Sequence, residues 1–347
     1  MNIEHWHTAD PPSADFERAW QVRLAAAPLA NFSMSVDLLK HEAAQGNHAI
    51  AMVVDSNDRH GAIVARETSD GLVSGWPWRW QAVVESEAGE GLQALNPGSA
   101  AWLFDTLKNA VGPARVQMFL PHPPSSGVTG HEAGRTILMS VTHDDDTLLA
   151  AIKANKRRQL RRAMREGYEV AEAHDPAAYR QFNELQHHVA ERHGLDTGEG
   201  SSDVEPGSEP WREWDLPWMW LLVATREGCV ESGLGSAIQP GGVQEARTSA
   251  TSEAGRHDGA FALLSHEEAK RCRDRGHLWL NLGGDTVYKR ETSGSLGTKL
   301  TMHAWLGGGG ARGALQNLSQ AVLRGRSLHD VGRGSLRRLL TIGRRQS

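Results

Sequence analysis

The chain has 347 residues, with 37 lysines and arginines against 42 aspartates and glutamates, a net charge of -5 and 39% hydrophobic residues. This length predicts two domains, and the slightly acidic balance argues against a protein that coats nucleic acid. The longest apolar run, at 217–224, is far shorter than the roughly 20 residues of a membrane-spanning helix, and the acidic N-terminus does not resemble a secretory signal, so we expect a soluble cytoplasmic protein.

The first third of the chain predicts a helix followed by a sheet. Phe16, Trp20 and Leu24 recur at a spacing of four, which is one face of an amphipathic helix. Two β-branched runs around the turn at 56–59 predict an antiparallel hairpin. The elements expected in this part are helices at 14–27 and 98–111, strands at 49–55, 61–66, 71–78, 114–120 and 136–141, and a loop at 121–134.

The segment from His143 to Gly167 carries the clearest local signals. An acidic run suits a helix N-terminus and Gly167 suits a left-handed stop, so we predict one helix of about twenty residues. Apolar residues gather on one side of this helix, and basic residues cover the other. The basic residues are Lys153, Arg157, Arg158, Arg161, Arg162 and Arg165.

The rest of the chain repeats the same kinds of element. Short turns join three strand-like runs at 218–225, 230–237 and 243–250, which predicts an antiparallel meander. The other elements expected here are strands at 168–172, 277–282 and 299–306, helices at 176–193 and 261–275, and a long polar loop at 194–217. The order of elements predicts two similar α/β units in tandem.

Several motifs of the second unit resemble FemAB-like and CelD-type acyltransferases, in the wider N-acetyltransferase (GNAT) superfamily. The run from Lys156 to Val170 resembles the basic helix and the strand that open the second domain of that family. Asn281-Leu282-Gly283-Gly284 resembles its D-L-G-G strand end, and Lys299 stands where its F-K motif is usual. Further similar segments are 182–194, 248–253, 261–264 and 269–276. Asn281 and Gly297 depart from the usual acid and phenylalanine.

The resemblance implies an α/β (α+β) fold of two tandem GNAT-like domains with mixed, largely antiparallel sheets and a cleft between them. Their expected limits are 1–141 and 142–310, with a C-terminal helix at 311–347 returning to the first. The implied activity is transfer of an acyl group to an amine or hydroxyl of a glycan or peptide acceptor, a cell-envelope or polysaccharide precursor. The long helical hairpin of some tRNA-using members is missing, which favours acyl-CoA, such as acetyl-CoA, as the donor. Aminoacyl-tRNA as the donor and a non-catalytic binding module remain alternatives.

Donor-binding residues are expected on the basic helix and at the strand end. Lys156, Arg157, Arg158 and Arg161 could grip phosphates, or they could form an ordinary solvated face. The backbone of Gly283-Gly284 could approach an acyl carbonyl, or it could be a plain turn.

Proton transfer needs an ionisable group, and Glu253, His257 and Asp285 are the candidates near predicted strand ends. Because Lys299 stands at the lysine of the F-K motif, the resemblance implies that it binds a carboxylate or phosphate of the acceptor. Trp76 and Trp78 would lie on one face of a strand, as an acceptor platform or as core.

Two further features concern metals and membranes. With only Cys229 and Cys272 and no fixed partners for the paired histidines, we expect no metal site. The tail at 312–347 holds eight arginines and one acid, a composition that suits peripheral contact with anionic lipid or packing on the first unit.

Overall fold

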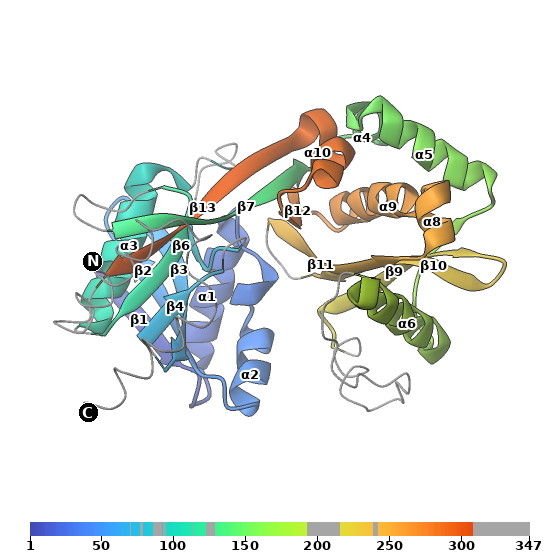
Figure 1. Cartoon of the computed structure of the whole chain (residues 1–347). Helices are drawn as coiled ribbons and strands as arrows, with labels where there is room; N and C mark the ends of the chain where they lie inside the picture. Colours follow the sequence, from blue (N-terminus) through green and yellow to red (C-terminus); the bar gives the residue numbers. More distant parts are fainter. Residues whose placement is uncertain are drawn as a thin grey trace, which may run out of the picture.

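The computed structural model describes residues 1–69, 71–76, 79–85, 92, 95–112, 114–122, 129–192, 216–238 and 242–307. Its strands form one 13-stranded sheet in the order β1-β2-β3-β4-β6-β13-β7-β12-β11-β10-β9-β8, with β5 paired to β3 (Figure 1). Trp78, most of the predicted loop at 194–217 and the predicted helix at 311–347 lie outside the described residues.

The N-terminal half, up to Ser140, contains the first seven strands. The helices are α1 (Ala14–Ala26), α2 (Val36–Ala44) and α3 (Pro97–Val111), with a 3-10 turn, η1 (Phe32–Met34). The strands are β1 (Asn2–His7), β2 (Ala49–Asp55), β3 (His60–Thr68), β4 (Gly71–Ser74), β5 (Ala82–Val84), β6 (Val116–Leu120) and β7 (Thr129–Ser140). The predicted hairpin is confirmed, because β2 and β3 pair antiparallel from Ala49–Arg66 to Asp55–His60.

The C-terminal half follows the same pattern. Its helices are α4 (Asp145–Ala151), α5 (Ala154–Arg165), α6 (Pro176–Arg192), α8 (Glu253–Asp258), α9 (Ala260–Asp274) and α10 (Val287–Ser293), with a 3-10 turn, η3 (Gly294–Leu296). The strands are β8 (Glu169–Glu172), β9 (Met219–Arg226), β10 (Cys229–Ala237), β11 (Val243–Thr251), β12 (Trp279–Gly284) and β13 (Gly297–Gly307). The predicted meander is confirmed as the antiparallel set β9-β10-β11.

The sheet is continuous between the two halves. β13 lies between β6 and β7, and β7 in turn pairs with β12 (Figure 1). The pairs β4–β6 and β11–β12 are parallel, and the other pairs of neighbours are antiparallel. The predicted α/β class with a mixed, largely antiparallel sheet is therefore confirmed.

Helices cover both faces of the sheet in the C-terminal half, with α9 on one face and α6 on the other (Figure 1). On α6, the fully buried ring of Phe182 packs against β10 at Gly233, where a Cβ atom would lie 2.2 Å from the ring. The glycine therefore sets how closely α6 approaches the sheet. No described helix is long and apolar enough to cross a membrane.

The predicted single helix at 143–167 is wrong, because α4 ends at Ala151 and α5 begins at Ala154. A Cβ atom at Gly294 would lie 1.7 Å from the carbonyl oxygen of Ala151, so η3 presses against the end of α4. The Lys153 N–H donates to the carbonyl oxygen of Glu291, 3.0 Å away. This hydrogen bond keeps the backbone between α4 and α5 extended. These contacts come from distant sequence, so local signals could not predict them.

The predicted loop at 121–134 is also too long, because β7 begins at Thr129 rather than at Thr136. The added residues pair with β13, from His303–Glu132 to Leu306–Thr129. A partner more than 150 residues away thus converts part of a glycine-containing stretch into strand.

Candidate functional site

The strands β11 and β12 separate part-way along their length. They pair in parallel from Val243–Trp279 to Glu245–Asn281, and beyond these residues β11 and β12 do not pair with each other. β11 nevertheless continues to Thr251 and β12 to Gly284. This separation opens the sheet between α9 and α10.

An inner cavity of about 90 Å³ lies at the separation. Its wall is mainly apolar, and Tyr288 and Lys289 of α10 and Arg247 of β11 add polar groups. The apolar lining comes from Leu234, Phe261, Leu280 and Leu282. Such a wall, with a few polar groups, suits a small reacting group held away from water.

An outer cavity of about 450 Å³ adjoins the inner one, since Ser249, Phe261, Tyr288 and Lys289 line both. Cationic side chains from α5, α6, α8 and α10 line it, and its described lining includes no acid. These are Lys156, Arg192, Arg256 and Lys289. A cavity with this charge favours an anionic ligand.

Burial changes the acid–base properties of the side chains at the junction of these cavities. The Lys156 Nζ lies 4.0 Å from the centre of the Tyr288 ring and 3.8 Å from Glu291 Oε2. Burial lowers the pKa of both Lys156 and Lys289, and it raises the pKa of Tyr288. The Tyr288 hydroxyl has no hydrogen bond of normal geometry within the described residues. The hydroxyls of Ser265 and Thr292 lie close enough to act on its pKa, and Tyr288 keeps its proton at neutral pH, so its hydroxyl is a candidate donor to a ligand.

A third cavity, of about 610 Å³, is lined by residues of the N-terminal half and by Arg247 of β11, which also lines the inner cavity. We call it the interdomain cavity. The guanidinium groups of Arg79 and Arg247 lie 5.4 and 5.2 Å from the centre of the Phe32 ring. Arg79 also forms an ion pair with the buried carboxylate of Glu245.

Several buried polar atoms in the lining of this interdomain cavity lack partners within the described part of the chain. They are Gln81 Nε2, one terminal nitrogen of Arg66, and His48 Nδ1. Buried donors without partners are costly, so a ligand with oxygen acceptors would satisfy them.

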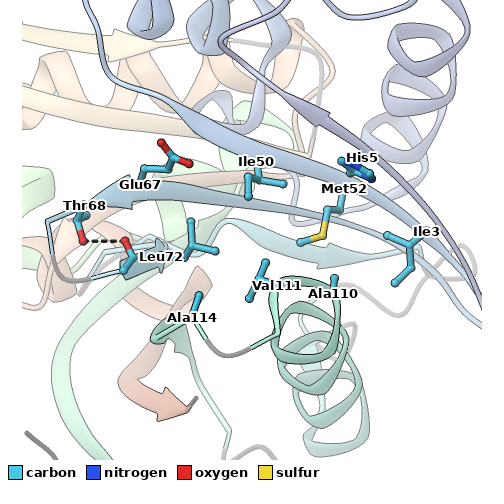
Figure 2. A pocket seen from close by; sticks show the side chains of 11 residues that line it. Ile3, His5, Ile50, Met52, Glu67, Thr68, Leu72, Ala110, Val111 and Ala114 are labelled. Carbon is cyan, nitrogen blue, oxygen red and sulfur yellow. Dashed lines mark hydrogen bonds between the residues drawn. The ribbon is translucent and has the colours of Figure 1, made fainter. Parts of the chain in front are cut away.

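A cavity of about 510 Å³ in the N-terminal half has a different character (Figure 2). Apolar side chains such as Ile50, Met52 and Leu72 line most of it, at the end of α3. Its carboxylate, on Glu67, already pairs with His7 at 3.0 Å. Because this cavity gathers no reactive groups, the separation of β11 and β12 is the better candidate site.

The basic residues that the sequence singled out on α5 have separate roles. Lys156 is buried and lines the outer cavity. Arg157 instead donates from NH1 to the carbonyl oxygens of Ala150 and Ile152, both at 2.6 Å, and so caps α4. Arg158 and Arg161 are exposed and line none of these cavities.

The predicted strand end does reach the site. Gly283 has a φ of +74°, and a Cβ atom there would lie 3.3 Å from the Lys289 Nζ. Its N–H donates to Asn281 Oδ1 at 2.9 Å, and Thr136 donates to the same oxygen at 2.6 Å. Gly284, the next residue, ends β12. Asn281, in place of the family's acid, thus shapes the turn that faces Lys289.

The structure does not bring the three predicted proton-transfer residues together. Glu253 is exposed at the start of α8, and His257 contacts Asp258 at 2.8 Å. Asp285 forms ion pairs with Arg290 at 2.6 Å and with Lys299 at 3.6 Å. None of the three predicted residues lines the inner or the outer cavity.

Of the two predicted acceptor-binding tryptophans, Trp76 lines the interdomain cavity and is 51% exposed. A core position for Trp76 is therefore excluded. Among the residues that the structure describes, no group of three or more histidines, cysteines or acids is placed to hold a metal ion.

Sequence reasoning missed Tyr288, Lys289, Arg247 and Arg256. Tyr288 and Lys289 follow Gly283-Gly284 closely, and a turn into a short helix after a strand end was the available signal. Arg247 and Arg256 had no local signal, because their place depends on the separation of the strands.

No protein-family model and no curated protein matches this chain. Among solved structures, the crystal structure of FemX is similar with a TM-score of 0.59 and 12% identity, covering 88% of this chain and 97% of that chain. A tandem GNAT protein from the clavulanic acid biosynthesis pathway has a TM-score of 0.46 and 11% identity, covering 89% and 99%. A C-terminal domain of a putative lysylphosphatidylglycerol synthetase from Agrobacterium fabrum has a TM-score of 0.45 and 15% identity, covering 79% of this chain and 89% of that chain. The similarity to FemX shows the fold, and the predicted α/β fold class is confirmed.

Proposed function

We propose that this chain is an acyltransferase that moves an acyl group from an acyl-CoA to an amine or hydroxyl of an anionic acceptor. The observation that carries the proposal is the pair of adjoining cavities at the separation of β11 and β12, a cationic outer cavity and a mainly apolar inner one. Arg247 lines both the inner cavity and the interdomain cavity. The FemX-like fold agrees with a transferase of the FemAB-like kind, and we propose cytoplasmic action on a cell-envelope or polysaccharide precursor.

The outer cavity suits the phosphates of CoA. Its cations come from four different helices and surround the space, and arginine and lysine are the usual ligands of phosphate. The thioester would then extend into the inner cavity, past Ser249 and Phe261. An apolar wall there excludes water and protects the thioester from hydrolysis.

The Tyr288 hydroxyl is the proposed proton donor to the leaving sulfur. Burial raises the pKa of this hydroxyl, so it keeps its proton at neutral pH. Because the same dry cavity also raises the proton affinity of the leaving sulfur, the hydroxyl can donate as negative charge develops there. Gly283 lies next to the Lys289 amine, which lines the same cavity. Because the Gly283 N–H already donates to Asn281, the N–H of Gly284 is the proposed donor to the acyl oxygen.

The interdomain cavity is the proposed acceptor site. The unpartnered nitrogens of Gln81 and Arg66 would bind a carboxylate or phosphate, and exposed Trp76 offers a flat apolar surface to a sugar ring or peptide. The role of Lys299 as an acceptor ligand stays a proposal, as does the division at residues 141 and 142.

One observation favours aminoacyl-tRNA as a second candidate donor. Arg158, Arg161 and Arg165 are exposed on α5, the helix that supplies Lys156 to the outer cavity. Exposed arginines beside a cationic cavity could follow an RNA backbone that leaves it.

A thermal-shift titration with acetyl-CoA, CoA and a short acceptor-stem RNA tests the donor, because a ligand of the native state raises the melting temperature. We expect saturable stabilisation by acetyl-CoA and CoA, which Arg256→Ala weakens and the matched change Arg158→Ala does not. Stabilisation by RNA alone would favour the second candidate. No stabilisation by any of these ligands would contradict both.

A further inference from the structure

Lys289 occupies the junction of the inner and outer cavities. Its side chain lines both, together with Ser249 of the opposite strand. Its Nζ lies so close to the end of β12 that a Cβ atom at Gly283 would be 3.3 Å away. The amine is thus beside the turn where we place the acyl carbonyl.

No carboxylate pairs with Lys289 within the described part of the chain. The nearby acids on and beside its own helix already have partners, since Glu291 lies 3.8 Å from Lys156, and Asp285 pairs with Arg290 and Lys299. The charged groups that face these two cavities from the other elements are all cations, namely Lys156 from α5, Arg192 from α6, Arg247 from β11 and Arg256 from α8.

A buried ammonium among cations, with no counter-ion, is costly, whereas a neutral amine is not. Burial accordingly lowers the pKa of Lys289, and no nearby acid opposes this effect. Lys156 differs, because its ammonium lies against the Tyr288 ring and near Glu291.

We propose that the neutral amine of Lys289 is the base that takes the first proton from the attacking ammonium group of the acceptor. This inference rests on the proposed transfer to an amine. The freed amine attacks the acyl carbon, and a carbon–nitrogen bond forms as the carbon–sulfur bond breaks. The second proton of the nitrogen ends on the leaving sulfur, through Tyr288, so that one amide, one thiol and one Lys289 ammonium result. Lys289 returns its proton to water before the next cycle.

The first test measures the protonation of Lys289 directly. NMR of the protein with carbon-13-labelled lysine side chains follows each Cε during a pH titration, and Lys289→Arg identifies the signal of Lys289. We expect Lys289 to titrate below the ordinary pKa of a lysine side chain, about 10.4. A Lys289 that titrates at or above that value would overturn the proposal, and this measurement requires no substrate.

The second test measures thiol release from acetyl-CoA with glucosamine 6-phosphate and a lysine-containing pentapeptide with a free carboxylate as acceptors. Lys289→Arg keeps the positive charge but cannot become neutral. We expect its kcat to fall about 100-fold, the low end for loss of a general base, with little change in KM for acetyl-CoA. In the Lys289→Arg variant, the midpoint of the rise of kcat with pH should move to the pKa of the acceptor amine.

The results separate this inference from the proposed function. An active wild type whose rate and pH profile survive Lys289→Arg would overturn the role of Lys289 alone. A wild type that neither binds nor consumes acetyl-CoA would overturn the proposed function, and the inference with it.

Discussion

The two parallel strand pairs of the sheet have related connections and end differently. In the N-terminal half the chain runs β4-β5-α3-β6, with β5 paired to β3, and in the C-terminal half it runs β11-α8-α9-β12. β4 ends at Ser74, its last paired residue, whereas β11 continues from Glu245 to Thr251 without pairing to β12. Residues of β4 and β6 line the interdomain cavity, whereas the separation of β11 and β12 opens the inner and outer cavities.

The crossover helices differ as well. α3 buries apolar residues such as Leu103, Phe104 and Leu107, whereas α9 also buries Glu268. Glu268 accepts hydrogen bonds from Ser236 of β10 and Gln244 of β11, just before the strands separate. A parallel strand pair thus borders the interdomain cavity in one half, and the inner and outer cavities, near a buried carboxylate, in the other.

Removal of the Tyr288 hydroxyl should have the largest effect. Tyr288→Phe should lower kcat about 100-fold or more, because the leaving sulfur loses its proton donor, while CoA binding stays unchanged. Steady-state kinetics with acetyl-CoA measure this effect. Tyr179→Phe is the matched control, since its hydroxyl donates to the Ala173 carbonyl, away from the cavities. Equal rates for the two variants would contradict the role of Tyr288.

Neutralising Glu268 tests the buried polar group of α9. Burial raises the pKa of Glu268 from its ordinary value of 4.5 to about 7, so the native state binds the proton more tightly than the unfolded chain. Stability is therefore lost as the pH rises from about 4.5 through 7. Glu268→Gln should remove this loss and stabilise the protein above pH 7 by about 2 kcal/mol, with no gain at pH 4.

Urea denaturation of the Glu268→Gln variant at pH 4, 6 and 8 measures this difference. Glu267→Gln, which changes the neighbouring and less buried carboxylate, is the control and should show no such trend. A constant difference between the Glu268 variant and the wild type at all three pH values would show that Glu268 does not titrate as described.

A large side chain at the junction of the inner and outer cavities should weaken CoA binding, and the same side chain in the apolar cavity of the N-terminal half should not. Ser249→Phe places a ring where the inner and outer cavities join, and should weaken CoA binding at least tenfold, about 1.4 kcal/mol. Ala110→Phe places the same ring in the apolar cavity of Figure 2 and should leave CoA binding unchanged. Calorimetric titration with CoA measures both. The reverse result would place the donor site in the N-terminal half.

The smallest expected effect separates capping from phosphate binding on α5. Arg157→Ala removes the cap of α4 and should lower the free energy of unfolding by about 1 kcal/mol without changing CoA affinity. Arg161→Ala, on the exposed side, should change stability by less than about 0.5 kcal/mol. A loss of CoA affinity in Arg157→Ala at unchanged stability would instead support the phosphate-binding role.

The sequence determined most of the secondary structure and the tandem order of the elements. Alternating β-branched runs and capped amphipathic segments are local signals, so the hairpin of β2 and β3 and the meander of β9 to β11 could be predicted from them. The same local information identified Lys156 and Gly283, because a basic helix and a glycine pair are visible in the sequence itself.

The tertiary structure alone decided the break between α4 and α5, the length of β7 and the location of the site. Each depends on backbone contacts between distant segments, such as Gly294 against Ala151 and β13 against β7. Tyr288 and Lys289 acquire their acid–base properties from burial, which no local pattern specifies. The sequence specifies which side chains can carry a charge, but the free-energy cost of that charge depends on the groups that the fold places around it.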